Sequence, residues 1–596
     1  MSAPTVEEIE RLLGDPYDAD NPYGFAAAVR RDEQDAFPEE LCGALREAGF
    51  HLNYLPTEWG GRFESFEHSM VVVRAAARRD LNIMPGTMFG ITAATCLALH
   101  GSPEQQKHVA EILGRGGAVG FALSEADHGS DLLANTVRLE PAADGWELTG
   151  EKWMVGLGRR CEALYLVART GGRGPGAFSA VLLDLPKDVE RSRAVPTSGM
   201  RGIDFAHLRF DRFPVPAEAL VGHEGQALES VMKAQQVVRV MSMAGSLGCA
   251  DTALRLTLDF ATARQVGRTT VRESPYPRRE LAVASAALLA ADVTALTAAR
   301  GIHVFPEVFS VWGCAAKHVV AENTEDLIRR CATVLATRSV LRTEGPGDGL
   351  FQKLQRDTAM VRVVDTSTLA NLRAYAAQLP TLAQSNHPRG AGNCANSHDS
   401  AAPANTPHPP RREDTDLIRA VFDLTEPLPP YTPEHLDLTA RGKSPITTAL
   451  FDIAPQATTT LTDHGDQTTA ALITRLTTAL TKLTEDTTTA DRDTGLVDLA
   501  DRFAHLHAAA CCLLLWWANP TRPLFGAPPG DTRWLAACLA YLLARADGTD
   551  PRREAPALLP ALDITTELHT RNRLFCAHPE QLAPHTELAP EPAADH

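Results

Sequence analysis

A change of hydrophobic period between residues 117 and 222 constrains this chain more than any other feature of its sequence. On both sides of it, apolar residues recur at the three- and four-residue spacing of helices. Within it, short apolar runs alternate with turn residues, which is typical of strands. Strands are expected over residues 119–124, 136–140, 146–149, 163–168, 178–183 and 207–211. The chain is therefore predicted to be mainly α with an inserted β domain.

The helical regions beside the β domain divide further. Before it, helices are expected over 39–49, 70–77, 91–100 and 102–113; after it, over 226–264, 278–303, 308–336, 349–357 and 360–379. Residues 382–413 are rich in Asn, Pro, Ala and Ser without periodicity, which predicts a disordered linker. The expected organisation is an N-terminal helical domain (1–116), a β domain (117–224), a helical bundle (225–381), the linker (382–413) and a C-terminal helical extension (414–596).

Composition excludes several classes of partner. The 596 residues include 57 Lys and Arg against 74 Asp and Glu, a formal charge of −17, which argues against nucleic acid and against an anionic membrane surface. The apolar run at 508–518 is too short for a bilayer, which takes about 20 residues. The eleven cysteines form no CxxC pair, and His505, His507 and His569 suit packing or surface positions. We expect a cytoplasmic protein without a membrane anchor or a metal site.

Two segments of the β domain are the most informative for chemistry. Residues 120–131 read GFALSEADHGSD, and residues 148–156 read LTGEKWMVG. A strand that ends in a polar, glycine-containing loop offers backbone N–H groups and hydroxyls to a phosphate or a polar heterocycle. An ordinary Ser/Asp/Gly turn would have the same composition, so these segments alone leave both interpretations open.

Together with PTEWGG at residues 56–61, the two segments resemble signatures of the acyl-CoA dehydrogenase family. The resemblance covers residues 20–381 and follows the family's order of domains. It implies an N-terminal helical domain, a middle β-barrel domain and a C-terminal helical bundle, with FAD between the last two. Residues 414–596 are similar to the extra module of longer dehydrogenases and acyl-CoA oxidases only in position and helical character. The chain is identified as a divergent member with a C-terminal helical extension.

The resemblance also implies which residues hold the cofactor. These are Phe121, Leu123, Ser124, Gly129, Ser130, Met154, Val155, Gly156 and Ser367. It assigns Ser130 and Arg239 to the substrate. Two positions depart from the family pattern: Met154 replaces an aromatic residue that packs on the flavin, and Gly156 replaces a threonine whose hydroxyl meets flavin N5.

The family's catalytic base falls on Asp365. In many members the base is a glutamate eight residues beyond an Arg-Asp pair, and Arg356-Asp357 precedes Asp365 at that spacing. An aspartate is shorter by one carbon–carbon bond, about 1.5 Å, so the site must close up or a water must relay the proton. The other family position for a base is Val238, which cannot serve. Asp365 also suits an ordinary N-cap of the last bundle helix.

The expected contacts to the flavin phosphates are eroded. The family's Arg-x-x-Phe-Gly becomes ARQVGR at residues 263–268, and its glycine-rich segment becomes LRTEG at residues 341–345. Arg264, Arg268 and Arg342 are candidate replacements for the phosphate charge, and each also suits an ordinary surface position.

These inferences predict a flavoprotein oxidoreductase that converts an acyl thioester, carried by CoA or an acyl carrier protein, to its α,β-unsaturated form. Asp365 would take the α-proton, FAD the β-hydride, and an electron-transfer partner or O2 the electrons. The divergence favours secondary metabolism, and the family's bundle contacts favour a homodimer. Two alternatives share the fold: a flavin-dependent oxidase or monooxygenase, and a non-redox, degenerate acyl-binding subunit.

Overall fold

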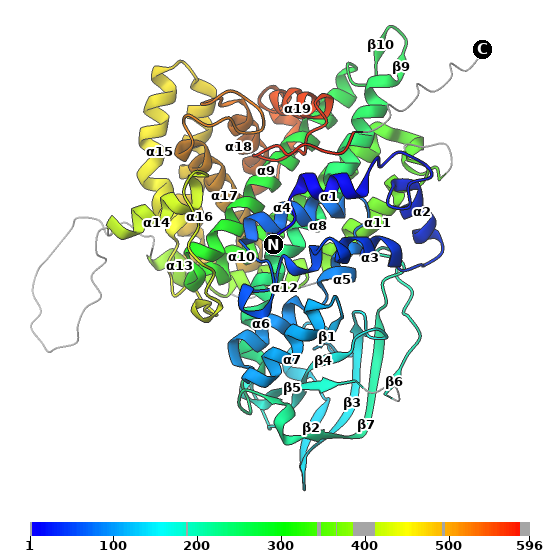
Figure 1. Ribbon diagram of the computed structural model, residues 1–596. Coiled ribbons are helices and arrows are strands. Elements are labelled where there is room, and N and C mark those ends of the chain that lie inside the picture. The colour runs from blue at the N-terminus through cyan, green and yellow to red at the C-terminus, as the bar shows by residue number, and fades with distance from the viewer. Residues whose placement is uncertain are drawn as a thin grey trace, which may run out of the picture.

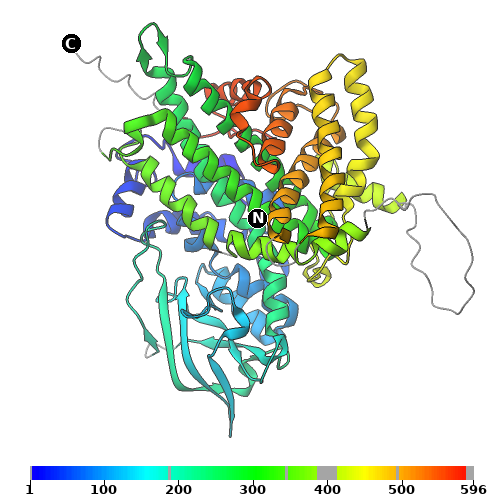
Figure 2. The ribbon, with the colours of Figure 1, turned by 180° about the vertical axis from the view of Figure 1, so that it is seen from behind.

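The computed structural model describes residues 3–185, 189–342, 347–364, 366–385, 412–490 and 495–584. A body of helices makes up most of the molecule, and the β domain projects from one end of it (Figure 1). The C-terminal helices lie against the side of this body, away from the β domain, as the view from behind also shows (Figure 2). The predicted fold class, mainly α with an inserted β domain and extra C-terminal helices, is confirmed.

Helices α1 to α7 precede the β domain. Their bounds are α1 Val6–Leu13, α2 Phe25–Glu33, α3 Glu39–Glu47, α4 Phe66–Ala77, α5 Ile83–Met88, α6 Ile91–His100 and α7 Pro103–Gly114. Ser102 caps α7, Gln105 returns a hydrogen bond to the Ser102 backbone, and Pro103 occupies the first position. Helices α2 and α5 lie outside the helical ranges expected within this domain.

The β domain is one sheet with the strand order β6-β7-β3-β2-β4-β5-β8, and β1 pairs with β4 in parallel. The strands are β1 Val119–Ala122, β2 Arg138–Ala142, β3 Gly145–Val155, β4 Ala163–Arg169, β5 Phe178–Asp184, β6 Glu190–Arg191, β7 Ala206–Pro216 and β8 Leu220–Val221. The first six residues of β4 are all buried, which explains its uninterrupted apolar run. β3, predicted to end at residue 149, continues to Val155 because β7 pairs with it that far.

The bundle follows. Its helices are α8 Ala227–Ala263, α9 Pro275–Val304, α10 Phe309–Leu335, α11 Leu350–Val363, α12 Thr368–Ala376 and α13 Leu379–Ser385. The predicted break between residues 357 and 360 is wrong. α11 continues through it, since Asp357 pairs with Lys353 one turn earlier, and the break falls after Val363. By length and composition, Ile83–His100 and α9 could each span a membrane, but the apolar window of α9 is wholly buried in this protein and that of Ile83–His100 is half buried.

The C-terminal helices pack on the bundle. They are α14 Arg412–Phe422, α15 Pro445–Asp463, α16 Gln467–Thr489, α17 Gly495–Ala518, α18 Arg533–Ala546 and α19 Ala555–Thr570. Helices α17, α18 and α19 all contact α9, and α17 also contacts α10 and α12. Residues 508–515 of the apolar run are therefore core of this contact, and residues 516–518 are half-buried. Of the predicted linker, residues 386–411 lie outside the described residues, whereas residues 382–385 and 412–413 are helical.

The Arg356-Asp357 pair joins three parts of the fold. Lys353 Nζ, buried on α11, lies 2.5 Å from Asp357 Oδ2 and 3.0 Å from Asp80 Oδ1 of the N-terminal domain. Asp357 Oδ1 accepts a hydrogen bond from the Met200 N–H of the β domain at 2.6 Å. Arg356 donates to a carbonyl of the same β-domain loop at 2.8 Å. This pair therefore fixes the β domain and the N-terminal domain against the bundle.

His303 links the N-terminal and C-terminal parts and makes stability depend on pH. Its Nε2 accepts from the Phe66 N–H at 3.1 Å, and its Nδ1 lies 3.0 Å from the Pro429 carbonyl oxygen. Burial lowers the pKa of His303 to about 4. The unfolded chain, with an ordinary pKa, takes up this proton first as pH falls. Stability is thus lost progressively from pH 6.5 down to pH 4, by about 2 kcal/mol at pH 5.

We expect His303→Gln to reduce by one the number of protons taken up on unfolding near pH 5. Urea unfolding of the wild type and the variant across pH 4.5–7.5 measures this number as the slope of stability against pH. His464→Gln, at an exposed position, is the control and should leave the slope unchanged. Equal slopes for wild type and His303→Gln would contradict the prediction.

Candidate active site

The loop that follows β1 is held by a buried ion pair. Lys152 Nζ, from β3, lies 2.9 Å from Glu125 Oε1 and donates to the Leu123 carbonyl oxygen at 3.0 Å. Glu125 also accepts from the backbone N–H groups of Thr136 and Val137. Burial acts to raise the pKa of Glu125, but Lys152 and these N–H groups hold that pKa below its usual value. The two β-domain motifs are thus tied together by side chains to which the sequence analysis gave no role.

The cofactor candidates of this loop differ in how far the described residues contact them. The Ser124 hydroxyl is half-buried, and no described residue forms a hydrogen bond with it. Gly129 has a φ of +52° and faces open space, and Ser130 is exposed. Phe121 is half-buried and stacks on Tyr165, with 5.8 Å between ring centroids. The loop therefore offers hydroxyl donors and an unobstructed stretch of backbone next to the stacked rings of Phe121 and Tyr165.

The end of β3 carries the two departures from the family pattern. Met154 has a φ of +53°, which is uncommon for a residue with a side chain, and its N–H donates to His207 Nδ1 at 3.3 Å. Val155 is buried in the sheet. A Cβ on Gly156 would lie 2.3 Å from Phe89 Cζ. Phe89, between α5 and α6, therefore occupies the space that a threonine side chain at position 156 would fill.

We expect Gly156→Ala to destabilise the protein by about 1–3 kcal/mol, the usual effect of overpacking a core. Phe89→Leu in the same chain should restore part of this loss, because leucine lacks the outer ring atoms of Phe89 that the new Cβ would contact. Urea unfolding of both single variants and the double variant measures the coupling. Gly114→Ala is the control, because a Cβ there meets open space. Additive effects of the two substitutions would contradict this packing.

The loop between α11 and α12 contains position 365, and its described residues are held from two other helices. Lys317, buried on α10, donates from Nζ to the carbonyl oxygens of Val364 at 2.5 Å and Thr366 at 3.1 Å. Thr366 has a φ of +77°, a rare conformation for a β-branched residue, and its hydroxyl donates to Gln235 Oε1 on α8. Asp365 itself lies outside the described residues. The buried Lys317 ammonium group thus fixes the backbone carbonyls on both sides of position 365.

Arg239 and Ser367 support this loop. Arg239 Nε, on α8, donates to Asn371 Oδ1 at 2.9 Å, and Asn371 Nδ2 donates to the Thr366 carbonyl oxygen at 3.1 Å. The Ser367 hydroxyl accepts a backbone N–H from the first turn of α12. The N-cap position that Asp365 also suited is therefore filled by Ser367. Both ribbon views place α12 at the end of the bundle nearest the β domain (Figures 1 and 2).

The arginines considered for the flavin phosphates lie elsewhere. Two short strands, β9 Gln265–Val266 and β10 Thr269–Thr270, form a hairpin between α8 and α9. Arg264 directly precedes β9, and Arg268 lies in the turn between the two strands. This hairpin lies at the opposite end of the molecule from the β domain (Figure 1). Within one chain these two arginines do not reach the loop after β1. Arg342 forms an ion pair with Glu33 of α2.

Three family models match successive parts of the chain. They describe the acyl-CoA dehydrogenase N-terminal domain (residues 25–117), middle domain (120–213) and C-terminal domain (225–368). The chain belongs to the acyl-CoA dehydrogenase family. It is accordingly an oxidoreductase that acts on CH–CH groups, and its family supports acyl thioester dehydrogenation in general. Helices α13 to α19 lie beyond all three matches.

Known proteins resemble the dehydrogenase part of this chain. Probable acyl-CoA dehydrogenase FadE25 of Mycobacterium tuberculosis is 27% identical over 311 residues, which are 51% of this chain and 79% of that protein. Butyryl-CoA dehydrogenase of Megasphaera elsdenii shares the fold with a TM-score of 0.56 and 18% identity, over 63% of this chain and 97% of that one. The prolyl acyl carrier protein oxidase AnaB does so with a TM-score of 0.56 and 15% identity, over 62% and 97%.

Proposed function

We propose that this family member is an FAD-dependent dehydrogenase that removes one hydrogen from the α-carbon and one from the β-carbon of an acyl thioester, with Asp365 as the base. One observation carries the assignment. Lys317 anchors the backbone on both sides of position 365, in the loop that leads into α12, and α12 lies at the end of the bundle nearest the β domain (Figure 1). A base must be held in place to reach its proton, and this loop is the one that the family's spacing selects.

The residues on the β domain suit FAD. Ser124 and Ser130 offer hydroxyls that form no hydrogen bond with the described part of the chain, and Gly129 leaves backbone open to a close approach. Met154 brings a thioether that packs on aromatic rings. When bound, FAD accepts the hydride that leaves the β-carbon.

Lys317 has an electrostatic effect as well as a positional one. A nearby cation favours the ionised form of a carboxylate. We propose that the Asp365 carboxylate takes the α-proton that the thioester makes acidic, and that Lys317 supplies positive charge on this side of the loop. Arg239, buried on α8 and joined to Thr366 through Asn371, adds a second positive charge on this side of the loop.

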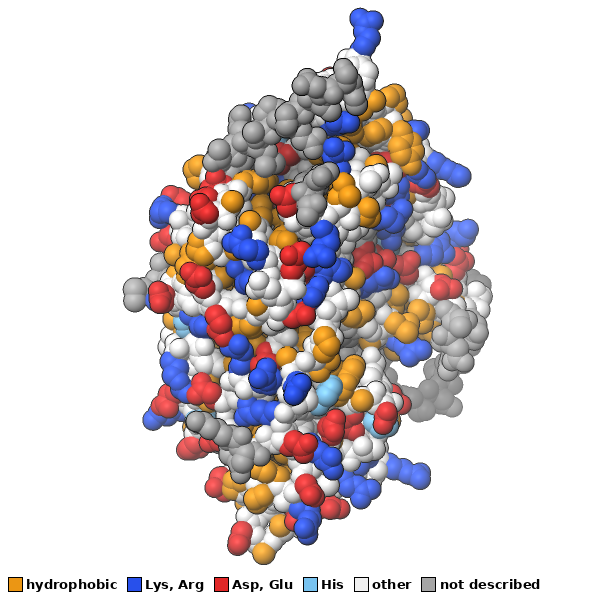
Figure 3. Space-filling model, turned by 90° about the vertical axis from the view of Figure 1, so that its right-hand side faces the viewer, with side chains coloured by type: hydrophobic (Ala, Val, Ile, Leu, Met, Phe, Trp, Pro, Cys, Tyr) orange, Lys and Arg blue, Asp and Glu red, His pale blue; other side chains and the backbone are white. Residues whose placement is uncertain are grey.

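The carrier of the acyl group is CoA or an acyl carrier protein. Both present an anionic arm. On the face drawn in Figure 3, Lys and Arg side chains are interspersed with Asp and Glu rather than gathered in one basic patch. AnaB, a fold neighbour, is a prolyl acyl carrier protein oxidase, which supports testing a carrier-protein substrate. Within this proposal the enzyme is a cytoplasmic homodimer of secondary metabolism that passes electrons to an electron-transfer flavoprotein or to O2.

One observation favours a second function, a flavin-dependent oxidase or monooxygenase. Phe89 and Gly156 leave no hydroxyl where the family places its donor to flavin N5. Loss of that donor alters the flavin's environment and is compatible with direct reaction with O2.

Spectroscopy of the purified full chain tests the proposal. We expect a yellow protein whose flavin absorbance is bleached under argon by an acyl thioester on CoA or on a carrier protein, with an α,β-unsaturated product. Oxygen consumption during turnover would favour the oxidase. A colourless protein that does not take up added FAD would contradict both and favour the non-redox, acyl-binding subunit.

A further inference from the structure

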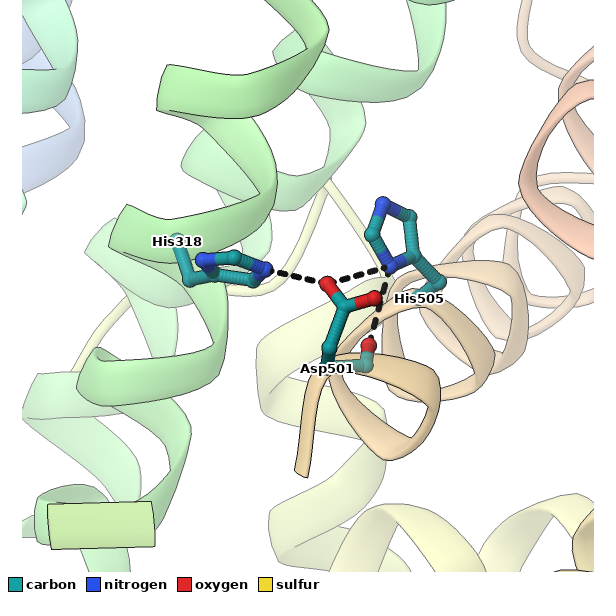
Figure 4. Close-up of side chains that lie close together, drawn as sticks. All are labelled: His318, Asp501 and His505. Atoms are coloured by element: carbon teal, nitrogen blue, oxygen red, sulfur yellow. Dashed lines mark hydrogen bonds and ion pairs between the residues drawn. The ribbon is translucent and has the colours of Figure 1, made fainter. Parts of the chain in front are cut away.

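Three side chains that commonly bind metal ions converge where α17 packs on α10 (Figure 4). His318 Nε2, on α10, lies 2.6 Å from Asp501 Oδ1, on α17. His505 Nδ1, one turn further along α17, lies 3.5 Å from the same oxygen. The three ligand atoms all lie within 4.8 Å of one another. We propose that His318, Asp501 and His505 bind a divalent transition-metal ion, with Zn2+ the best match, and that this ion joins the C-terminal helices to the bundle.

The chemistry and spacing of the ligands support zinc. Two imidazoles and a carboxylate are ligands that Zn2+ takes, with a water in the fourth position. Bonds of about 2.0 Å at tetrahedral angles separate ligand atoms by about 3.3 Å. The separations of 2.6 Å and 3.5 Å lie on either side of that value, and the third pair lies within 4.8 Å, so side-chain rotations have to bring the three ligand atoms to it. Asp501 and His505 are four residues apart and therefore share one face of α17.

Burial is distributed as a bound ion requires. His318 and His505 are buried, with 3% and 0% of their side chains exposed, so solvent does not compete for them. The Asp501 side chain is 41% exposed, which leaves a route for the ion and room for its water. Arg545 is the nearby cation, and its guanidinium lies 3.6 Å from Glu322, which offsets its repulsion of an ion.

The competing arrangement is a hydrogen-bonded trio without an ion. In it, His318 donates to the Asp501 carboxylate, and His505 Nδ1 donates to the Asp501 carbonyl oxygen at 2.9 Å. His318 Nδ1 and His505 Nε2 are buried and have no hydrogen-bond partner in the described part of the chain. An ion would leave these two nitrogens as N–H groups without the acceptors that metal-bound histidines normally have. Lost support of this kind weakens affinity about 10–100-fold, so we expect micromolar binding.

The test uses the full chain after removal of any affinity tag and treatment with EDTA. Calorimetric titration with zinc sulfate should show one equivalent bound per chain, and zinc should raise the thermal unfolding midpoint by several degrees. Zinc-edge X-ray absorption should show two imidazoles and oxygen ligands without sulfur. Asp501→Asn and His318→Gln should each weaken binding at least about tenfold. His507→Gln is the matched control, because His507 is a half-buried histidine two residues further along α17 and does not belong to the ligand cluster.

Two results would overturn the proposal. If Asp501→Asn and His318→Gln bind zinc as tightly as the wild type does, the zinc ion lies at another site. If zinc gives the wild type neither binding heat nor a higher unfolding midpoint, the three side chains form only the hydrogen-bonded trio and bind no ion. Circular dichroism checks that each variant is folded. If one is not, the absorption spectrum of the zinc-loaded wild type decides alone, since sulfur ligands or fewer than two imidazoles contradict the assignment.

Discussion

Asp251→Asn is expected to lower the free energy of unfolding by about 3–5 kcal/mol, the usual result of removing one partner from a buried ion pair. Asp251 Oδ1, on α8, accepts from Arg255 Nε at 2.7 Å and from Arg78 Nε at 3.0 Å. Its Oδ2 accepts from the Phe575 N–H at 3.0 Å, and Arg74 lies 3.5 Å away. An amide would leave three buried guanidinium groups short of negative charge.

The network around Asp251 also holds the C-terminal segment in place. Arg74 donates to the Phe575 carbonyl oxygen at 2.7 Å, and the Arg255 guanidinium lies 4.1 Å from the centre of the Phe575 ring. Asp292 accepts from the Ala577 N–H at 2.7 Å. Hydrogen exchange at residues 575–577 should therefore accelerate in Asp251→Asn more than exchange in the β domain.

Urea unfolding followed by circular dichroism measures the loss of stability. Glu7→Gln is the control, because it breaks an ion pair with Arg11 in which both side chains are more than two-thirds exposed, and such pairs contribute little. A loss for Asp251→Asn no larger than that of Glu7→Gln would mean that these guanidinium groups are solvated rather than paired.

Periodicity predicted the long helices well, because many turns average out local noise. The bounds of α8, α9 and α10 lie within three residues of those predicted. It failed at the end of α11. The chain breaks after Val363, where Lys317 on another helix holds the Val364 carbonyl, and no local residue marks that contact. The network around Asp251 escaped prediction for the same reason, since it joins α4 and α8 to a segment more than 300 positions further along the chain.

The site shows a similar division between local and distant information. Motif spacing selected the loop after β1 and position 365 as candidates, because both resemblances run along the chain, and both assignments stay predictions. It gave no role to Glu125 and Lys152, although both stand inside the quoted motifs, because their pairing across two strands appears only in the fold. Lys317 carried one signal: it is the lone lysine of α10, beside His318 in an otherwise apolar stretch, and a buried lysine needs partners.

Asp365→Asn is expected to lower turnover of an acyl thioester by about 10²–10⁴-fold, the range that a positioned general base contributes. The amide is nearly isosteric with the carboxylate but does not accept the α-proton. Flavin absorbance and the unfolding midpoint should be unchanged, which separates loss of the base from loss of FAD or of the fold. Anaerobic bleaching of the flavin by the thioester, followed by stopped flow, measures the step directly. Bleaching at the wild-type rate would show that another group is the base.

Lys317→Met tests how the base is supported. It removes the donor to the Val364 and Thr366 carbonyls and the positive charge beside position 365. Loss of this positive charge should move the acidic limb of kcat/KM to higher pH. A merely structural role for Lys317 would lower turnover without moving that limb. Lys107→Met, at an exposed position of α7, is the control and should leave both the rate and the pH profile unchanged.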